Sequence, residues 1–282
     1  MRTIFKVLTL GMLFMNTSAF SVSSDFIKTD DRERSATELY TRLNPGKTFY
    51  LSSSDKEFSE IAKKYIYSDI ASQSTLSLHD RELVTVTTLV TLQMPEHMLT
   101  NSFEEALNAG VPPVELREGI YQLSPYIGIA RTIVALEILN KVFEKKNICI
   151  SDSEENLATT SDQDRFEQGL KFQTDTYGDR ITKMRETTPA YQKHLQDDLS
   201  AFCFGDIYTR KGLDLKHREF LTVAAIGTLG IEAQFKSHVI GTLAAGGSKE
   251  EVIGIITAMN PYIGFPRTLN LLKYANEIFA DK

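Results

Sequence analysis

Apolar residues in the second half of the chain recur with the spacing of an α-helix. From residue 218 to Gly230 they cover most of a helix circumference, which is typical of a central, buried helix. Gly230 is a natural stop for that helix, and a second helix is expected from about Ile231 to Ala245. No stretch alternates convincingly between apolar and polar residues, as a half-buried strand would. The pattern therefore predicts an all-α protein.

The starts of the next two helices are also marked in the sequence. Ser248 and Glu251 have the spacing of a capping box, which predicts a third helix that runs to about Met259. Pro261 is expected to begin or precede the last helix. The first half of the chain repeats this order, with Pro112-Pro113 at the corresponding helix start.

The chain contains an internal repeat. Leu-Ser-Leu-His-Asp-Arg-Glu-Leu-Val-Thr-Val at 76–86 corresponds to Leu-Asp-Leu-Lys-His-Arg-Glu-Phe-Leu-Thr-Val at 213–223. Pro-Tyr-Ile-Gly-Ile-Ala-Arg-Thr at 125–132 corresponds to Pro-Tyr-Ile-Gly-Phe-Pro-Arg-Thr at 261–268. The two copies of the first motif are offset by 137 residues and those of the second motif by 136. The first copy therefore holds one extra residue between the motifs, expected around 93–98. This self-similarity predicts two tandem helical units.

Polar segments indicate where the two units begin and end. Residues 149–164 are largely polar and acidic, which predicts a linker between a first domain at 37–148 and a second at 165–282. Residues 21–36 are similarly polar and are expected to form a leader. Residues 1–20 hold two basic residues, an apolar stretch and then small residues, as a signal peptide does. An N-terminal helix packed on the body is the alternative.

Charge and the N-terminal segment limit the partners. The 282 residues carry a formal charge of −6, which disfavours a nucleic-acid partner. The signal-like segment predicts export, to the periplasm or out of the cell. No later segment is apolar enough for a membrane helix, so no membrane contact is expected after cleavage.

Residues 204–226 of the second copy, together with Ser237-His238 and 261–270, resemble the carboxymuconolactone decarboxylase family. The resemblance covers roughly residues 165–280, and more weakly 40–146. It implies two tandem alkyl hydroperoxidase D-like helical domains and a homo-oligomer built by helix packing. It also implies decarboxylation of a lactone acid or, in a branch with a redox cysteine pair, peroxide reduction.

The resemblance also places candidate catalytic residues. In the peroxidase branch a Glu, a C-x-x-C pair and a His follow in a frame that Glu219 and His238 match. The two cysteine positions hold Ile231 and Gln234, neither of which can form a thiolate. The two-cysteine peroxidase mechanism is therefore not expected. The two cysteines present, Cys149 and Cys203, are far apart in the sequence, which leaves their pairing open.

Decarboxylation of a lactone acid requires stabilisation of the negative charge that develops and delivery of a proton to carbon. His238 can deliver a proton near neutral pH, and a partly buried Glu219 can shuttle protons or orient the ring. Arg267 is a candidate carboxylate clamp, and Tyr262 a candidate lining residue of the substrate pocket. Each has a structural alternative. Glu219 lies near a helix start, where a carboxylate is favoured, and His238 fits a half-exposed helix position. Arg267 has a counterpart, Arg131, in the first copy, and Tyr262 fits a tight helix entry.

The first copy departs from this pattern. Glu82 matches Glu219, but the position of His238 falls on Ser102 or Asn101, which do not titrate near neutral pH. The first copy is therefore interpreted as a degenerate packing partner. No histidine has partners at metal-ligand spacing and no dinucleotide or phosphate motif is present, so neither a metal site nor a cofactor is expected.

Three functions remain open. The first is an enzyme that acts on a small carboxylated or lactone substrate in a decarboxylation or a related lyase or isomerase step. The second is a non-catalytic helical scaffold or ligand-binding protein. The third, disfavoured because the C-x-x-C pair is missing, is an antioxidant activity of the peroxiredoxin type.

Overall fold

The computed structural model describes residues 29–49, 55–151, 153 and 157–280. Within these residues every regular element is helical, which confirms the expected fold class. The predicted signal peptide at 1–20 lies outside the described residues, as do residues 21–28 of the expected leader. From Thr29 onward the rest of that leader belongs to the first helix.

The repeats follow each other along the chain. The first contains the helices α1 (Thr29–Leu43), α2 (Lys56–Lys64), η1 (Tyr65–Ile70), α3 (Ala71–Gln73), α4 (Leu78–Thr91), α5 (Glu96–Asn108), α6 (Pro113–Ile127) and α7 (Ile129–Lys145). The second contains α9 (Arg165–Tyr177), α10 (Asp179–Thr187), η2 (Ala190–Gln192), α11 (Lys193–Asp198), η3 (Leu199–Tyr208), α12 (Leu215–Leu229), α13 (Glu232–Ala244) and α14 (Lys249–Ala280).

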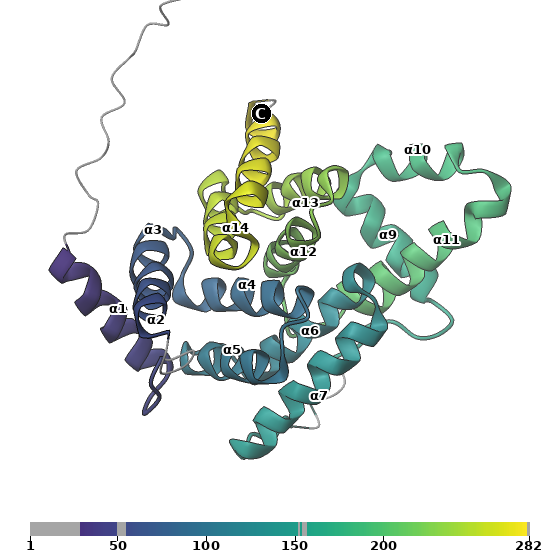
Figure 1. Cartoon of the computed structure of the whole chain (residues 1–282). Coiled ribbons are helices and arrows are strands. Elements are labelled where there is room, and N and C mark those ends of the chain that lie inside the picture. Colours follow the sequence, from purple (N-terminus) through teal and green to yellow (C-terminus); the bar gives the residue numbers. More distant parts are fainter. Residues whose placement is uncertain (1–28, 50–54, 152, 154–156, 281–282) are drawn as a thin grey trace, which may run out of the picture.

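The two repeats pack around their equivalent helices α4 and α12, which contact each other near the middle of the molecule. The remaining N-terminal helices lie at opposite ends, α1–α3 at one and α9–α11 at the other (Figure 1). Each end carries an equivalent ion pair, Arg32–Asp69 in the first repeat and Arg165–Asp206 in the second. The structure is therefore close to two-fold symmetric within one chain.

Most helix ends agree with the sequence pattern. Gly230 caps α12 in the left-handed conformation, with φ 75° and ψ 31°. Ser248 and Glu251 form the predicted capping box, each backbone N–H donating to the other's side chain, at 2.8 and 3.0 Å. The extra residue of the first copy lies in the loop between α4 and α5, where Gln93 has a positive φ of 56°.

Of the two predicted possibilities for Pro261, the structure shows that it precedes the last helix and does not begin it. The third helix continues through Pro261, and the chain breaks at Gly264, which has φ 74° and ψ 161°. In the first repeat α6 likewise contains Pro125 and ends at Gly128, with φ 90°. Glycine adopts these positive φ angles without the strain that a side chain would bring, so glycine and not proline sets the boundary.

The two repeats share their hydrophobic cores. Leu221 and Ala225 of α12 pack into the core formed mainly by α4–α7. Leu76 and Val84 of the first repeat pack in return into the core formed by α12–α14. The repeats are therefore units of sequence that bury their apolar faces against each other. None of the described helices is long and apolar enough to cross a membrane.

Two glycines allow α9 and η3 to cross backbone to backbone. A Cβ atom on Gly169 would overlap the carbonyl oxygen of Ser200, and one on Gly205 would overlap that of Arg165. Only residues without a side chain fit at this crossing. The contact fixes the position of η3, which carries part of the candidate site.

Gly205→Ala is expected to lower the free energy of unfolding by about 1–3 kcal/mol, because the two backbones must separate to admit the methyl group. Urea unfolding followed by circular dichroism measures the change. Gly227→Ala is the control, since its added Cβ would meet only side-chain ends, at 3.0 Å or more. Equal stability of Gly205→Ala and the wild type would contradict the close crossing.

Candidate functional site

Glu219 and His238 meet between α12 and α13. Nδ1 of His238 lies 2.9 Å from Oε2 of Glu219. Glu219 is fully buried, and 11% of the His238 side chain is exposed. Since the two helices pack directly against each other, their spacing of nineteen residues brings both side chains to one contact.

Two tyrosines complete the surroundings of the Glu219 carboxylate. The hydroxyl groups of Tyr177 and Tyr208 donate to Oε1 of Glu219, at 2.9 and 2.8 Å. Burial and the nearby Glu219 charge raise the pKa of Tyr208 well above its ordinary value, so this phenol stays protonated and donates. Three hydrogen bonds thus hold a buried carboxylate in one orientation.

These contacts indicate which ring nitrogen of His238 carries the hydrogen. Both phenols donate to Glu219, so Nδ1–H of His238 is the group that donates to Oε2. The neutral ring then carries its lone pair on Nε2. Nε2 is therefore the ring nitrogen that remains for contact with a ligand.

The first repeat contributes to this site through Tyr126 of α6. Its hydroxyl lies 2.9 Å from that of Tyr208, and its ring packs edge-on against His238 at 5.5 Å. Because Tyr208 donates to Glu219, the hydrogen bonds run from Tyr126 through Tyr208 to the carboxylate. Cys203 lies beside this chain, 3.8 Å from the Tyr126 hydroxyl, and burial raises its pKa to about 12.

Gly241 provides the space that Glu219 occupies. A Cβ atom at this position of α13 would overlap Oε2 of the carboxylate. The residue with the equivalent place in the first repeat is Glu105, 136 residues earlier. The two repeats therefore differ at two positions of the site, that of Gly241 and that of His238.

In the first repeat the equivalent place holds two carboxyl groups. Glu82 accepts from the guanidinium of its neighbour Arg81, at 2.6 Å. Glu105 accepts hydrogen bonds from Asn44 and Tyr67, at 2.7 and 2.8 Å. Ser102, at the position of His238, is buried. Among the described residues no imidazole faces Glu82, so this repeat lacks the pair found in the second.

The comparisons with known proteins agree with this duplication. The sequence profile of the carboxymuconolactone decarboxylase family matches residues 56–141 and 193–277, which together make up more than half of the chain. The chain belongs to the carboxymuconolactone decarboxylase family.

Individual relatives show how far the similarity extends. The 4-carboxymuconolactone decarboxylase of Acinetobacter baylyi is 27% identical over 122 residues, 43% of this chain and 91% of that protein. An uncharacterized 15.0 kDa protein of Paracoccus denitrificans is 34% identical over 104 residues, 36% of this chain and 72% of that protein.

A solved structure supports the fold. A protein of Burkholderia xenovorans LB400, named for a gamma-carboxymuconolactone decarboxylase subunit, superimposes with a TM-score of 0.51 at 19% identity. The alignment covers 89% of this chain and 99% of that one. The tandem carboxymuconolactone decarboxylase fold therefore extends over both repeats.

The structure separates the two predicted substrate-binding residues from the Glu219–His238 pair. Arg267 donates to the carbonyl oxygen of Thr228 at the end of α12, about 13 Å along that helix from Glu219. Its charge caps a helix C-terminus, where cations are favoured. Tyr262 is half-buried in the first repeat's site, where it lines a small cavity with Glu82 and Glu105. Neither residue therefore lies beside the Glu219–His238 pair.

Sequence reasoning also missed three residues of the site. Tyr126 had a signal, because it is the counterpart of Tyr262 in the duplicated Pro-Tyr-Ile-Gly motif. The two-fold arrangement carries each of these tyrosines into the other repeat's site. Tyr208 follows a repeated Asp-Ile pair but has Ala71 as its counterpart, and Tyr177 ends a helix with no repeated motif.

The carboxyl pair of the first repeat gives a prediction about pH. Burial and the nearby Glu82 charge raise the pKa of Glu105 to about 7, from an ordinary value of 4.5 that applies to the unfolded chain. Between these two values the folded state holds a proton that the unfolded chain has released. Stability therefore falls as the pH rises through this range.

Glu105→Gln is expected to remove this fall in stability. At pH 8 its free energy of unfolding is expected to exceed that of the wild type by about 2 kcal/mol. Its amide oxygen can still accept from Asn44 and Tyr67, so the packing is kept. Unfolding in urea between pH 4.5 and pH 8 measures the effect. The control is Glu104→Gln. Burial raises the pKa of Glu104, but the hydrogen bonds from Lys47 and Lys145 outweigh burial and lower the pKa overall. The change in stability with pH that comes from Glu104 is therefore expected to have the opposite sign. A wild type whose stability does not fall over this range would refute the prediction.

Proposed function

We propose that the second repeat carries out acid/base chemistry on a small carboxylated or lactone substrate. The observation that supports it most is the buried hydrogen bond between Glu219 and His238, with two phenols oriented on the same carboxylate. A relative that aligns over 91% of its length is a 4-carboxymuconolactone decarboxylase. Acid/base chemistry of this kind suits the loss of carbon dioxide from a lactone acid.

In such a decarboxylation, the bond between the carboxyl carbon and the ring breaks, and its electron pair stays on the ring carbon. Conjugation with the lactone carbonyl spreads this charge. His238, in its protonated form, delivers a proton from Nε2 to that carbon. Glu219 acts behind the ring, because its charge holds the imidazole in place and stabilises the imidazolium before the proton is transferred.

A non-catalytic, ligand-binding role is the second candidate. It is favoured by how little of the pair reaches the surface, since Glu219 is fully buried and only 11% of the His238 side chain is exposed. The peroxidase role has less support. Cys203 is buried with a raised pKa of about 12, so it stays a thiol near neutral pH and is a poor nucleophile.

A ligand-stabilisation screen tests the proposal. The wild type, His238→Ala and Ser102→Ala are melted with a panel of small carboxylic acids and lactones that includes 4-carboxymuconolactone. A ligand at 100 times its Kd stabilises the folded state by about 2.7 kcal/mol, which raises Tm by several degrees. Ser102→Ala is the matched control, because Ser102 holds the equivalent position and its hydroxyl has no partner in the described part of the chain.

The expected result is a ligand that stabilises the wild type and Ser102→Ala but not His238→Ala. A ligand that stabilises all three equally would place binding elsewhere, and a panel without any ligand would favour the scaffold role.

We also propose that the chain is exported and self-associates. Export rests on residues 1–20. Self-association is supported by exposed apolar side chains at equivalent positions of the two repeats, Ile129 with Phe265 and Ile133 with Leu269, which are 49–60% exposed. Cell fractionation and light scattering test these two proposals. A cytosolic chain, or a monomer at all concentrations, would contradict them.

A further inference from the structure

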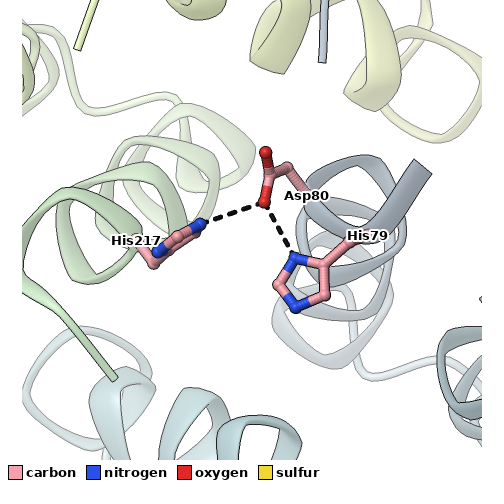
Figure 2. A group of neighbouring side chains, drawn as sticks. All are labelled: His79, Asp80 and His217. Atoms are coloured by element: carbon pink, nitrogen blue, oxygen red, sulfur yellow. Dashed lines mark hydrogen bonds and ion pairs between the residues drawn. The ribbon is translucent and has the colours of Figure 1, made fainter. Parts of the chain in front are cut away.

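A second group of titratable side chains lies where the two repeats meet. His79 and Asp80 lie in the first turn of α4, and His217 lies in the first turn of α12. Figure 2 shows both rings directed at one oxygen of Asp80: Nδ1 of His79 lies 2.9 Å from Oδ1, and Nε2 of His217 lies 3.0 Å from it. The three side chains are 14–26% exposed, so a solute can reach them.

The internal symmetry explains why these residues meet. Asp80 and His217 hold the same position in the two repeats, 137 residues apart, three residues after the helix N-caps Ser77 and Asp214. Since α4 and α12 pack against each other, equivalent positions at their N-terminal ends face each other. The sequence suggests no partners for these histidines because the spacing within each copy shows none.

Each ring is also held from behind by a second carboxylate. Nε2 of His79 lies 2.9 Å from Glu115, and Nδ1 of His217 lies 2.9 Å from Asp214. Metal-binding histidines commonly donate their second ring N–H to a carboxylate in this way, which fixes the tautomer and turns the lone pair toward the ion. Here that arrangement turns both lone pairs toward Asp80.

The charge of the group also suits a cation. Three carboxylates, those of Asp80, Glu115 and Asp214, surround two imidazoles, and the Lys216 ammonium near Asp80 and Asp214 offsets only part of their charge when both rings are neutral. A divalent ion would neutralise most of this charge. An open pocket of about 610 Å³ adjoins the group and is lined by both histidines. Among the described residues that line it, Lys211 is the one lysine or arginine.

We propose that His79, Asp80 and His217 bind one divalent transition-metal ion of the zinc class. The ligand atoms are Nδ1 of His79, Nε2 of His217 and a carboxylate oxygen of Asp80, which lie within 4.8 Å of one another. Zinc bound at about 2.0–2.1 Å to each of them leaves a fourth position for water, on the side of the open pocket. Because α4 and α12 belong to different repeats, the ion clamps the repeats together.

The competing explanation is that protons occupy the place of the ion, with each imidazolium held between two carboxylates. Isothermal titration of tag-free, metal-stripped full chain with Zn²⁺ at neutral pH distinguishes the two. The expected result is one Zn²⁺ per chain and a rise in Tm on addition of the ion. Co²⁺ is expected to give the visible absorption of a four-coordinate site with nitrogen ligands.

Asp80→Asn and His217→Ala are expected to weaken Zn²⁺ binding at least 100-fold and to abolish the rise in Tm. His194→Ala, which removes an exposed histidine, and His238→Ala, which removes another histidine beside a carboxylate, are expected to bind as the wild type does. A wild type that binds no Zn²⁺ would overturn the proposal. Binding that survives in both Asp80→Asn and His217→Ala, or that is lost in His238→Ala, would overturn it as well.

Discussion

Replacing Glu219 with glutamine is expected to reduce turnover of a lactone acid by about 10²–10⁴-fold. The amide has nearly the same shape as the carboxylate and fits the space beside Gly241, so the folded structure is kept. It has no charge to stabilise the imidazolium form of His238. The expected loss is therefore in kcat, at an unchanged KM, and steady-state kinetics measures it.

Glu82→Gln is the matched control for this experiment, because it changes the equivalent carboxylate of the first repeat. Glu82 is buried and paired with Arg81, and no histidine of the described chain faces it. Its replacement is expected to leave kcat within a few-fold of the wild type. If both variants lost the same activity, or neither lost any, the assignment of chemistry to the second repeat would be wrong.

The largest expected effect on stability comes from Glu118→Gln, which should lower the free energy of unfolding by about 3–5 kcal/mol. Glu118 is fully buried on α6, and its carboxylate accepts from Arg210 at 2.8 Å and from Arg218 at 3.4 Å. Burial lowers the pKa of Arg218 and the Glu118 charge opposes that change. Without the carboxylate, two guanidinium groups remain close together with no counter-charge.

Urea unfolding measures this change, and Glu96→Gln is its control. Glu96 pairs with Lys141 at 2.8 Å, but both side chains are more than half exposed. Exposed pairs of this kind contribute about 0–1 kcal/mol. An unfolding free energy for Glu118→Gln within 1 kcal/mol of the wild type would show that the ion pairs of Glu118 with Arg210 and Arg218 contribute little to holding the repeats together.

Local features of the site can be predicted from the sequence. The stop of α12 at Gly230 and the capping box at Ser248 depend on a few neighbouring residues, and the structure confirms both. The meeting of Glu219 and His238 depends on two adjacent helices joined by a short loop, so the family's spacing is sufficient to suggest it.

Features that depend on the association of the two repeats cannot be predicted in this way. Tyr126 and Tyr262 each lie in the other repeat's site, and no spacing within one copy indicates such an exchange. For the same reason the sequence places Tyr262 near the Glu219–His238 pair and suggests no partner for His79 or His217. The sequence shows the duplication but not the axis that relates its two copies.

The role of Arg267 shows a different limit. Its charge suggests a carboxylate clamp, yet the structure directs it to the carbonyl oxygen of Thr228. Charge and position near a turn do not distinguish a helix cap from a ligand-binding residue. The repeated arginine at 131 is consistent with the structural alternative for Arg267.

The release of carbon dioxide from 4-carboxymuconolactone by the wild-type chain tests the Glu219–His238 assignment most directly, with His238→Ala at the same concentration as the reference. We expect release by the wild type that is proportional to protein concentration, and release by His238→Ala that is at least 100-fold slower. Equal rates for the two proteins, on this compound and on related lactone acids, would contradict the claim that Glu219 and His238 form a working acid/base pair.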